Sequence, residues 1–210
     1  MLTVQSFVNT PVSSNCYVLF DWDFGNDCII VDPGSRSEKE LIDYLEGEYL
    51  VPKFIILTHE HFDHCWGVNE LVNKYHIPVV CSELCAEAIK YEKKNCSVFY
   101  DNKDPFVINN ETIKVEEIDY ELLFEGKMIK FFLTPGHTEA SICFSIADFF
   151  FTGDTLIKDM RTITKLPTGS LNRLHYSIEL IKSLAHRGYT VCPGHGNCFM
   201  LDDYDFGSVF

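Results

Sequence analysis

The sequence of 210 residues is long enough for one domain with a substantial hydrophobic core and does not require a second. Acidic residues outnumber basic ones by 31 to 17, and the net charge of −14 argues against nucleic acid, because phosphate recognition needs a basic surface. No apolar run approaches membrane-spanning length, and the first residues lack the pattern of an export signal. We therefore expect a cytoplasmic protein that binds no membrane and acts on a small molecule.

The nine cysteines are an odd number, and none lies in a Cys-x-x-Cys pair. Without an export signal, this pattern favours reduced thiols over a disulfide framework. Cys28, Cys143 and Cys192 fall inside apolar runs and are predicted to be small core residues. Cys65 and Cys198 each lie beside a histidine-containing motif, so their thiols are candidates for oxidation or for substrate contact.

Short apolar and alternating runs in the first half predict three opening antiparallel strands and then alternating helices and strands. The predicted strands are residues 4–8, 16–21, 28–31, 54–57 and 78–81, and the predicted helices are 37–48, capped by Ser35 or Ser37, 67–75 and about 82–91. Residues 92–104 are rich in charge and asparagine without apolar periodicity, which predicts a surface excursion.

The second half predicts another sheet that ends in a helix and a closing strand. Its strands are expected at residues 106–108, 112–118, 121–124, 128–133, 141–146, 149–151 and 189–192, with a hairpin turn at 125–126 and an amphipathic helix at 171–185. A sheet with helices followed by a second sheet with a helix favours an α/β fold, a four-layer αββα sandwich in one domain over residues 1–210.

A cluster of His59, His61, Asp63 and His64 follows the apolar run 54–57. The cluster lies where that strand ends, which is the usual position of sites in open α/β sheets. Side chains alternate in an extended segment, so His59 and His61 point the same way, while Asp63 and His64 can turn toward a second point. The pattern therefore predicts two adjacent metal ions rather than the His-Glu-x-x-His zinc helix, and its alternative is a histidine-rich surface turn.

Three later segments repeat one form, in which a strand-like run breaks at glycine and a metal-binding side chain follows: His137, Asp154 and His195. Each alone has a structural alternative, a turn or a helix cap. Together with the first cluster they make five histidines and two aspartates, a set that suits two divalent metal ions, zinc above all, with iron and manganese also compatible. Three histidines lack this context and are predicted to be structural: His76, His175 and His186.

The pattern of histidines and aspartates resembles that of the metallo-β-lactamase superfamily, and most of all its glyoxalase II-type hydrolases. Residues 14–17, 31–34 and 193–196 also look like positions of that family. The resemblance implies the αββα metallo-β-lactamase fold with metals at the sheet edges between the layers. It implies one metal on His59, His61 and His137, the other on Asp63, His64 and His195, and Asp154 bridging both.

The activity implied by this resemblance is hydrolysis of a thioester or related ester by a metal-bound hydroxide, with Asp63 as the catalytic residue that carries the proton to the leaving group. Two divalent ions, two ligating carboxylates and a hydroxide leave the site at roughly +1, which admits a small anionic substrate. Glyoxalase II proteins carry an added C-terminal helical domain that grips glutathione, whereas this sequence ends 15 residues after His195. Glutathione recognition is therefore not implied.

Two alternatives remain at this point. One is a mononuclear iron persulfide dioxygenase of the same superfamily, which the sequence does not separate from a hydrolase. The other is a non-catalytic or nucleic-acid-processing relative, which the complete ligand set and the charge of −14 disfavour. Arg161 and Lys165 follow the Asp154 loop and are candidate anion-binding side chains, with solvated loop charges as the favoured interpretation.

Overall fold

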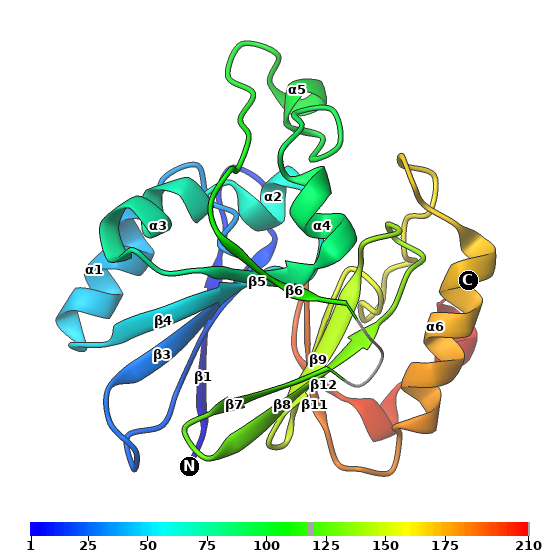
Figure 1. Cartoon of the computed structure of the whole chain (residues 1–210). Helices are drawn as coiled ribbons and strands as arrows, with labels where there is room; N and C mark the ends of the chain where they lie inside the picture. Colours follow the sequence, from blue (N-terminus) through cyan, green and yellow to red (C-terminus); the bar gives the residue numbers. More distant parts are fainter. Residues whose placement is uncertain (117–119, 210) are drawn as a thin grey trace. The chain divides into compact units, whose positions relative to one another are not determined.

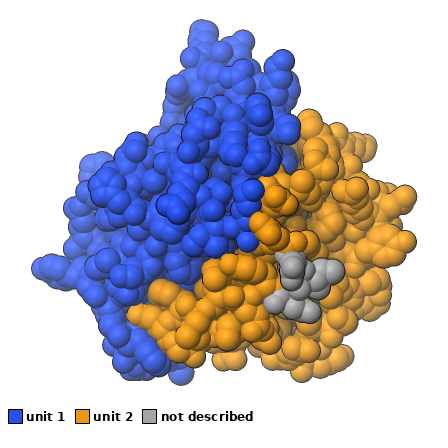
Figure 2. All heavy atoms as spheres, viewed as in Figure 1, with its two compact units in different colours: residues 1–81, 85–114 blue, residues 82–84, 115–210 orange. Residues whose placement is uncertain are grey.

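The computed structural model describes residues 1–116 and 120–209 and divides the chain into two compact units (Figures 1 and 2). Unit 1 comprises residues 1–81 and 85–114, and unit 2 comprises residues 82–84 and 115–210. Each unit contains a sheet that has six strands among the described residues. No helix in the described ranges is long and apolar enough to cross a membrane.

The first sheet joins its strands in chain order, with an antiparallel opening and a parallel centre. Its strands are β1 (Thr3–Val8), β2 (Asn15–Phe20), β3 (Asp27–Val31), β4 (Val51–Ile56), β5 (Val79–Ser82) and β6 (Thr112–Val115). Every residue of β2 is buried, and so is every residue of β3 after Asp27, as expected for strands covered on both faces. The predicted antiparallel opening and βα alternation are confirmed.

Two predictions for this region were wrong. Residues 106–108 form no strand, because their backbone groups bond to loop and helix partners: Phe106 N donates to Ser97 Oγ, and Ile108 N donates to the Ile89 carbonyl. The strand predicted at 112–118 belongs to the first sheet rather than the second, since β6 extends the edge beside β5. Its last predicted residues, 117 and 118, lie outside the described part of the chain.

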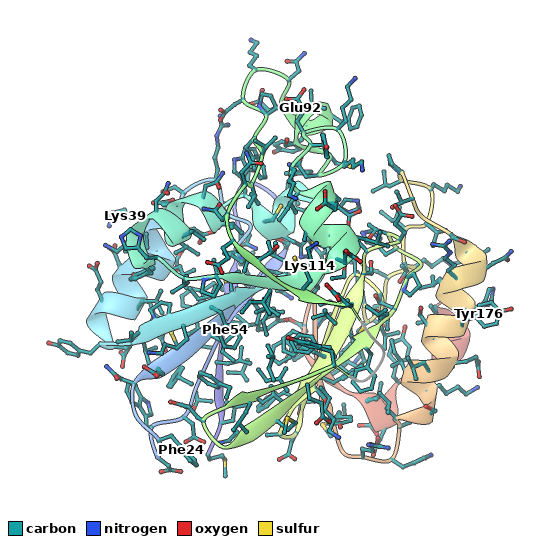
Figure 3. All side chains as sticks on the ribbon, viewed as in Figure 1. Phe24, Lys39, Phe54, Glu92, Lys114 and Tyr176 are labelled. Carbon is teal, nitrogen blue, oxygen red and sulfur yellow. The ribbon has the colours of Figure 1, made fainter. Side chains whose placement is uncertain are left out.

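Helices follow the strands of unit 1 in alternation (Figure 1). They are α1 (Lys39–Gly47), α2 (Phe62–Cys65), α3 (Val68–Tyr75), α4 (Glu83–Ala88), whose first two residues count with unit 2, and α5 (Ser97–Tyr100). The predicted excursion at 92–104 contains α5. Its first residue, Glu92, is labelled in Figure 3. Capping of α1 by Ser35 or Ser37 was wrong: the N-cap is Glu38, whose Oε1 accepts a hydrogen bond from Ser35 N at 2.9 Å.

The Glu38 carboxyl is buried beside Gly67 and Glu70. A Cβ at Gly67 would lie 2.0 Å from Glu38 Oε1, so only glycine allows this approach. Burial is the main cause that raises the pKa of Glu38 to about 8; the Ser35 hydrogen bond opposes the rise and nearby Glu70 adds to it. Glu38 is therefore protonated in the folded protein at neutral pH.

A Glu38→Gln variant tests this assignment through the pH dependence of stability. Because the folded pKa is above the unfolded value, the contribution of Glu38 is fully present below about pH 4.5 and is lost as the pH rises toward about 8. The free energy of unfolding in urea should therefore fall less steeply between pH 5 and about 8 in the variant than in the wild type. Equal slopes in the two proteins would contradict a protonated Glu38.

The second sheet runs in reverse chain order from its last strand to its first, β12-β11-β10-β9-β8-β7. Its strands are β7 (Glu121–Phe124), β8 (Lys127–Leu133), β9 (Ile142–Ile146), β10 (Phe149–Gly153), β11 (Thr190–Pro193) and β12 (Phe199–Met200). The predicted hairpin turn is confirmed. Glu125 and Gly126 have φ of 47° and 71°, and a positive φ at both central residues is typical of a type I′ turn. β11 was expected to close the sheet, which was wrong because β12 pairs beyond it.

Helix α6 (Leu171–Ser183) supplies the core of unit 2. Ser170 caps it by accepting a hydrogen bond from Arg173 N, and the predicted face of leucines and isoleucines is buried in one cluster with strand residues. The cluster comprises Cys143, Phe150, Leu156, Leu174, Ile178, Ile181, Leu184, Val191, Phe199, Leu201 and Val209. This packing fixes the strands that precede the candidate ligands of unit 2.

A pair of variants on α6 tests that packing. Ile178→Ala should lower the free energy of unfolding by about 2–5 kcal/mol, because the buried side chain leaves a cavity in the cluster. Tyr176→Ala is the matched control, since Tyr176 is 80% exposed on the same helix (Figure 3) and its loss should change stability by about 0.5 kcal/mol or less. Urea denaturation measures both, and similar losses in the two variants would contradict the packing described.

Candidate metal centre

The histidine cluster of unit 1 occupies the loop that follows β4 and the start of α2. His59, His61 and His64 are 1%, 5% and 0% exposed, which excludes a solvated surface turn. The His59 ring lies 4.8 Å from that of His61 and 4.2 Å from that of His64, measured between ring centroids. Asp63 Oδ2 lies 3.8 Å from His64 Nε2. Unit 1 thus gathers three imidazoles and a carboxylate in one buried loop.

The Asp32 carboxylate, at the end of β3, organises this loop. Asp32 Oδ1 accepts from Thr58 N at 2.8 Å, and Oδ2 accepts from the Thr58 hydroxyl at 2.6 Å and from His64 Nδ1 at 3.0 Å. Because the Thr58 hydroxyl donates to Asp32, its oxygen accepts from His59 Nδ1, which lies 3.1 Å away. One carboxylate therefore orients two imidazoles, one of them through a hydroxyl group.

The backbone of Asp63 is held by two residues from the opening strands and turns. The Ser14 hydroxyl donates to the Asp63 carbonyl, and Asn9 Nδ2 donates to Ser14 Oγ at 2.8 Å. A Cβ at Gly34 would lie 1.6 Å from the same carbonyl oxygen, so no other residue fits there. Ser14 and Gly34 together fix the position of the Asp63 backbone. These contacts give a physical reason for the family-like segments 14–17 and 31–34 of the sequence.

The motifs of unit 2 bring His137, Asp154 and His195 together after the ends of three strands. Asp154 Oδ2 lies 3.5 Å from His137 Nε2 and 3.6 Å from His195 Nε2. His137 is 2% exposed, and its Nδ1 donates to the Ile163 carbonyl at 2.8 Å. A carbonyl only accepts, so Nδ1 carries a proton, and in the neutral imidazole Nε2 then holds the lone pair. One carboxylate oxygen therefore lies at similar distances from two imidazole nitrogens.

Both groups fit divalent metal ions by the chemistry of their donors. Nδ1 of His59, His64 and His137 is engaged by a hydroxyl, a carboxylate and a carbonyl respectively, which is how metal-binding histidines are usually held so that Nε2 faces the ion. Imidazole and carboxylate are ligands for zinc, iron or manganese. The donor atoms of Asp32, His59 and His64 lie within 4.8 Å of one another, but the contact from Asp32 to Nδ1 makes it an orienting residue.

All seven residues predicted from the sequence lie in these two groups, four in unit 1 and three in unit 2. That the two groups form one site stays a prediction. The three histidines predicted to be structural are exposed: His76, His175 and His186. Arg161 and Lys165 are exposed as well, in line with solvated loop charges.

The cysteines beside the motifs differ in exposure. The Cys65 thiol is fully buried, donates to the Glu60 carbonyl at 3.3 Å, and has its pKa raised well above the ordinary value by burial. It is therefore closed to solvent and held as a thiol. Cys198 is exposed. The predicted core cysteines, Cys28, Cys143 and Cys192, are buried, which confirms that prediction.

Sequence reasoning did not identify Asp32 and Thr58 as residues of the site. Asp32 lies 26 positions before Thr58 and 32 before His64, so the contact depends on β3 pairing in parallel with β4. The signal that could have found Asp32 is the Asp-Pro-Gly that ends a buried strand. Asp32 also has a φ of 49°, in the left-handed region that aspartate adopts more readily than most residues.

Comparisons with known proteins show which family the chain belongs to. The family model described as the metallo-β-lactamase superfamily matches residues 9–195. An uncharacterised protein of Mycobacterium leprae is 29% identical over 93% of this chain and 92% of its own length. A hydroxyacylglutathione hydrolase of Wigglesworthia glossinidia brevipalpis is 29% identical over 98% of this chain and 71% of its own length.

Two solved structures share the fold. One is described as the BLEG-1 B3 metallo-β-lactamase, with a TM-score of 0.86 and 25% identity over 98% of this chain and 99% of its own. The other is TTHA1623 in a di-iron-bound form, with a TM-score of 0.75 and 25% identity over 94% of each chain.

The protein belongs to the metallo-β-lactamase superfamily, a group of hydrolytic enzymes that bind divalent metals. The predicted α/β class and metallo-β-lactamase fold are confirmed.

An Asp32→Asn variant tests the orienting role of this carboxylate. The amide is a poorer acceptor for three donors, so His64 and His59 should lose their fixed orientation and zinc affinity should fall by roughly 10- to 100-fold. Competition with a zinc chelator measures the affinity. Asp27→Asn is the control, because Asp27 begins the same strand and pairs with Lys53 at the surface. Equal zinc affinity in the wild type, Asp32→Asn and Asp27→Asn would contradict an orienting role of Asp32.

Proposed function

We propose that the protein is a binuclear metal-dependent hydrolase acting on a thioester or related ester of a small, anionic substrate. His59, His61 and His137 would hold one divalent ion, Asp63, His64 and His195 the other, and Asp154 would bridge them. This proposal joins the ligand groups of the two units into one site. Zinc is the proposed metal, with iron as the alternative that the di-iron form of TTHA1623 supports.

The observation that carries the proposal is the position of Asp154. Its Oδ2 lies 3.5 and 3.6 Å from the Nε2 atoms of His137 and His195, two histidines proposed to hold different ions. These separations are too long for strong hydrogen bonds, and they suit a carboxylate that shares its coordination between two cations.

The residues themselves would position the ions and move a proton. When bound, two divalent ions polarise a carbonyl group and lower the pKa of a water molecule toward about 7. Asp63, with its backbone fixed by Ser14 and Gly34, would take a proton from the attacking water and deliver it to the leaving thiolate or alkoxide. Asp32 and Thr58 would keep His64 and His59 in the tautomer that offers Nε2.

The substrate class rests on the resemblance and on charge. The hydroxyacylglutathione hydrolase among the relatives supports a thioester, but the chain spans 71% of that relative's length. The net charge of −14 disfavours a polyanion such as nucleic acid, whereas the two cations would give the site itself a local positive charge. A small ester bearing a carboxylate satisfies both conditions.

The function is tested by metal content and hydrolysis together. Protein purified without added metal should contain about two ions per chain by elemental analysis, and the zinc-loaded protein should hydrolyse at least one member of a panel of thioesters, lactones, phosphodiesters and β-lactams. Asp154→Asn should lose at least one ion and lower kcat by roughly 1000-fold. His175→Gln is the matched control, because His175 is exposed on α6 and should keep both properties.

The outcomes separate the hydrolase from its rival. One iron per chain, with oxygen consumed in the presence of glutathione persulfide, would replace the hydrolase with a mononuclear dioxygenase. No hydrolysis of any panel member by fully loaded protein would end the hydrolase assignment.

A further inference from the structure

A pair of cysteines flanks the loop that carries His195. Cys192 lies in β11 and Cys198 directly precedes β12. The Cys198 thiol donates to the Cys192 sulfur across 3.8 Å. Both residues belong to unit 2, and each lies three positions from His195 in the sequence.

The register of the two strands places these cysteines opposite each other. Thr190 pairs with Met200 and Val191 with Phe199, so the same register continued by one position sets Cys198 opposite Cys192. Leu201 N donates to the Tyr189 carbonyl, which makes 189 and 201 the hydrogen-bonded kind of pair. Because the two kinds alternate, the cysteines occupy a non-hydrogen-bonded pair, where Cα atoms are about 4.5 Å apart and side chains lie closest. That separation falls within the range of disulfides, about 4.4–6.8 Å.

The two thiols differ in access. Cys198 is exposed, whereas Cys192 is 1% exposed. The contact with Cys198 and burial raise the pKa of Cys192 well above its ordinary value. An oxidant in solution therefore reacts with Cys198 first, and Cys192 is the second thiol, in contact with it.

We propose that Cys192 and Cys198 form a site of reversible oxidation, in which a small disulfide such as oxidised glutathione converts the two thiols into an intramolecular disulfide. The Cys198 thiolate attacks one sulfur of the oxidant, so a mixed disulfide forms and one thiolate leaves. Cys192 then loses its proton to solvent and its sulfur attacks Cys198 Sγ, which releases the second thiol. Two protein thiols are oxidised while one small disulfide is reduced to two thiols.

The bond would close a seven-residue ring that contains His195. The site rests on the strand register and on the two sulfurs, so it is independent of the proposed hydrolase activity. The thiol measurement below needs no metal and no substrate.

The sequence provides an internal control. Trypsin releases both cysteines in one peptide, residues 188–210, because no lysine or arginine follows Arg187. Cleavage after Lys74 and Lys90 releases Cys81 and Cys85 together in residues 75–90. Cys81 and Cys85 are both fully buried, so an oxidant in solution does not reach them in the folded protein.

The test treats reduced, folded protein with oxidised glutathione, then alkylates it under denaturing conditions and analyses the tryptic peptides by mass spectrometry. Peptide 188–210 should carry no alkyl group and should be lighter than the unalkylated dithiol peptide by two hydrogen atoms, and dithiothreitol should restore both alkylation sites. Peptide 75–90 should be alkylated twice throughout. Cys192→Ser should retain glutathione on Cys198, and Cys198→Ser should show neither adduct nor disulfide.

The proposal is overturned if wild-type peptide 188–210 is alkylated twice, or if it keeps glutathione on Cys198 without an internal disulfide. The wild-type protein and Cys198→Ser test the proposal even if Cys192→Ser fails to fold, because Cys198 is exposed and serine keeps a hydrogen-bonding group beside Cys192. Circular dichroism of the treated protein confirms that the measurement reports the folded state.

Discussion

The local order of the histidine loop in unit 1 depends on the Asp32 carboxylate. A buried carboxylate is costly unless its lone pairs are satisfied, and Asp32 meets this condition with three donors from Thr58 and His64. The same bonds fix imidazole tautomers, which a metal site requires. The parallel pairing of β3 with β4 brings these residues together, so the position of the loop depends on the register of the sheet.

The candidate ligands of unit 2 are oriented by different contacts from those of unit 1. Here the strands end at glycines, and the side chains that follow them converge on Asp154. His137 is oriented by a backbone carbonyl of Ile163 rather than by a carboxylate. The helix α6 packs its apolar face on the sheet and leaves this end of the strands for polar groups. Unit 2 thus has an apolar cluster beneath α6 and its candidate ligands after the strand ends.

The sequence predicted what local patterns determine. The β7-β8 hairpin followed from its Glu-Gly turn, α6 from its periodic apolar face, and the seven ligand candidates from histidines and aspartates placed after strand-like runs. It failed where partners are distant in the chain. The apolar run 106–108 bonds to Ser97 at the start of α5 and to Ile89, and β12 has only two residues, too few to show a period. The orienting role of Asp32 depends on a contact across 32 positions, which no local pattern contains.

The proposed function requires that the seven candidate ligands, Asp154 among them, hold two divalent ions. The most direct measurement is a crystal structure of the zinc-loaded protein with anomalous diffraction recorded at the zinc edge. The account predicts two anomalous peaks, about 3.5–4 Å apart, with the Asp154 carboxylate bound to both. A single peak, or an Asp154 side chain that contacts neither ion, would contradict it.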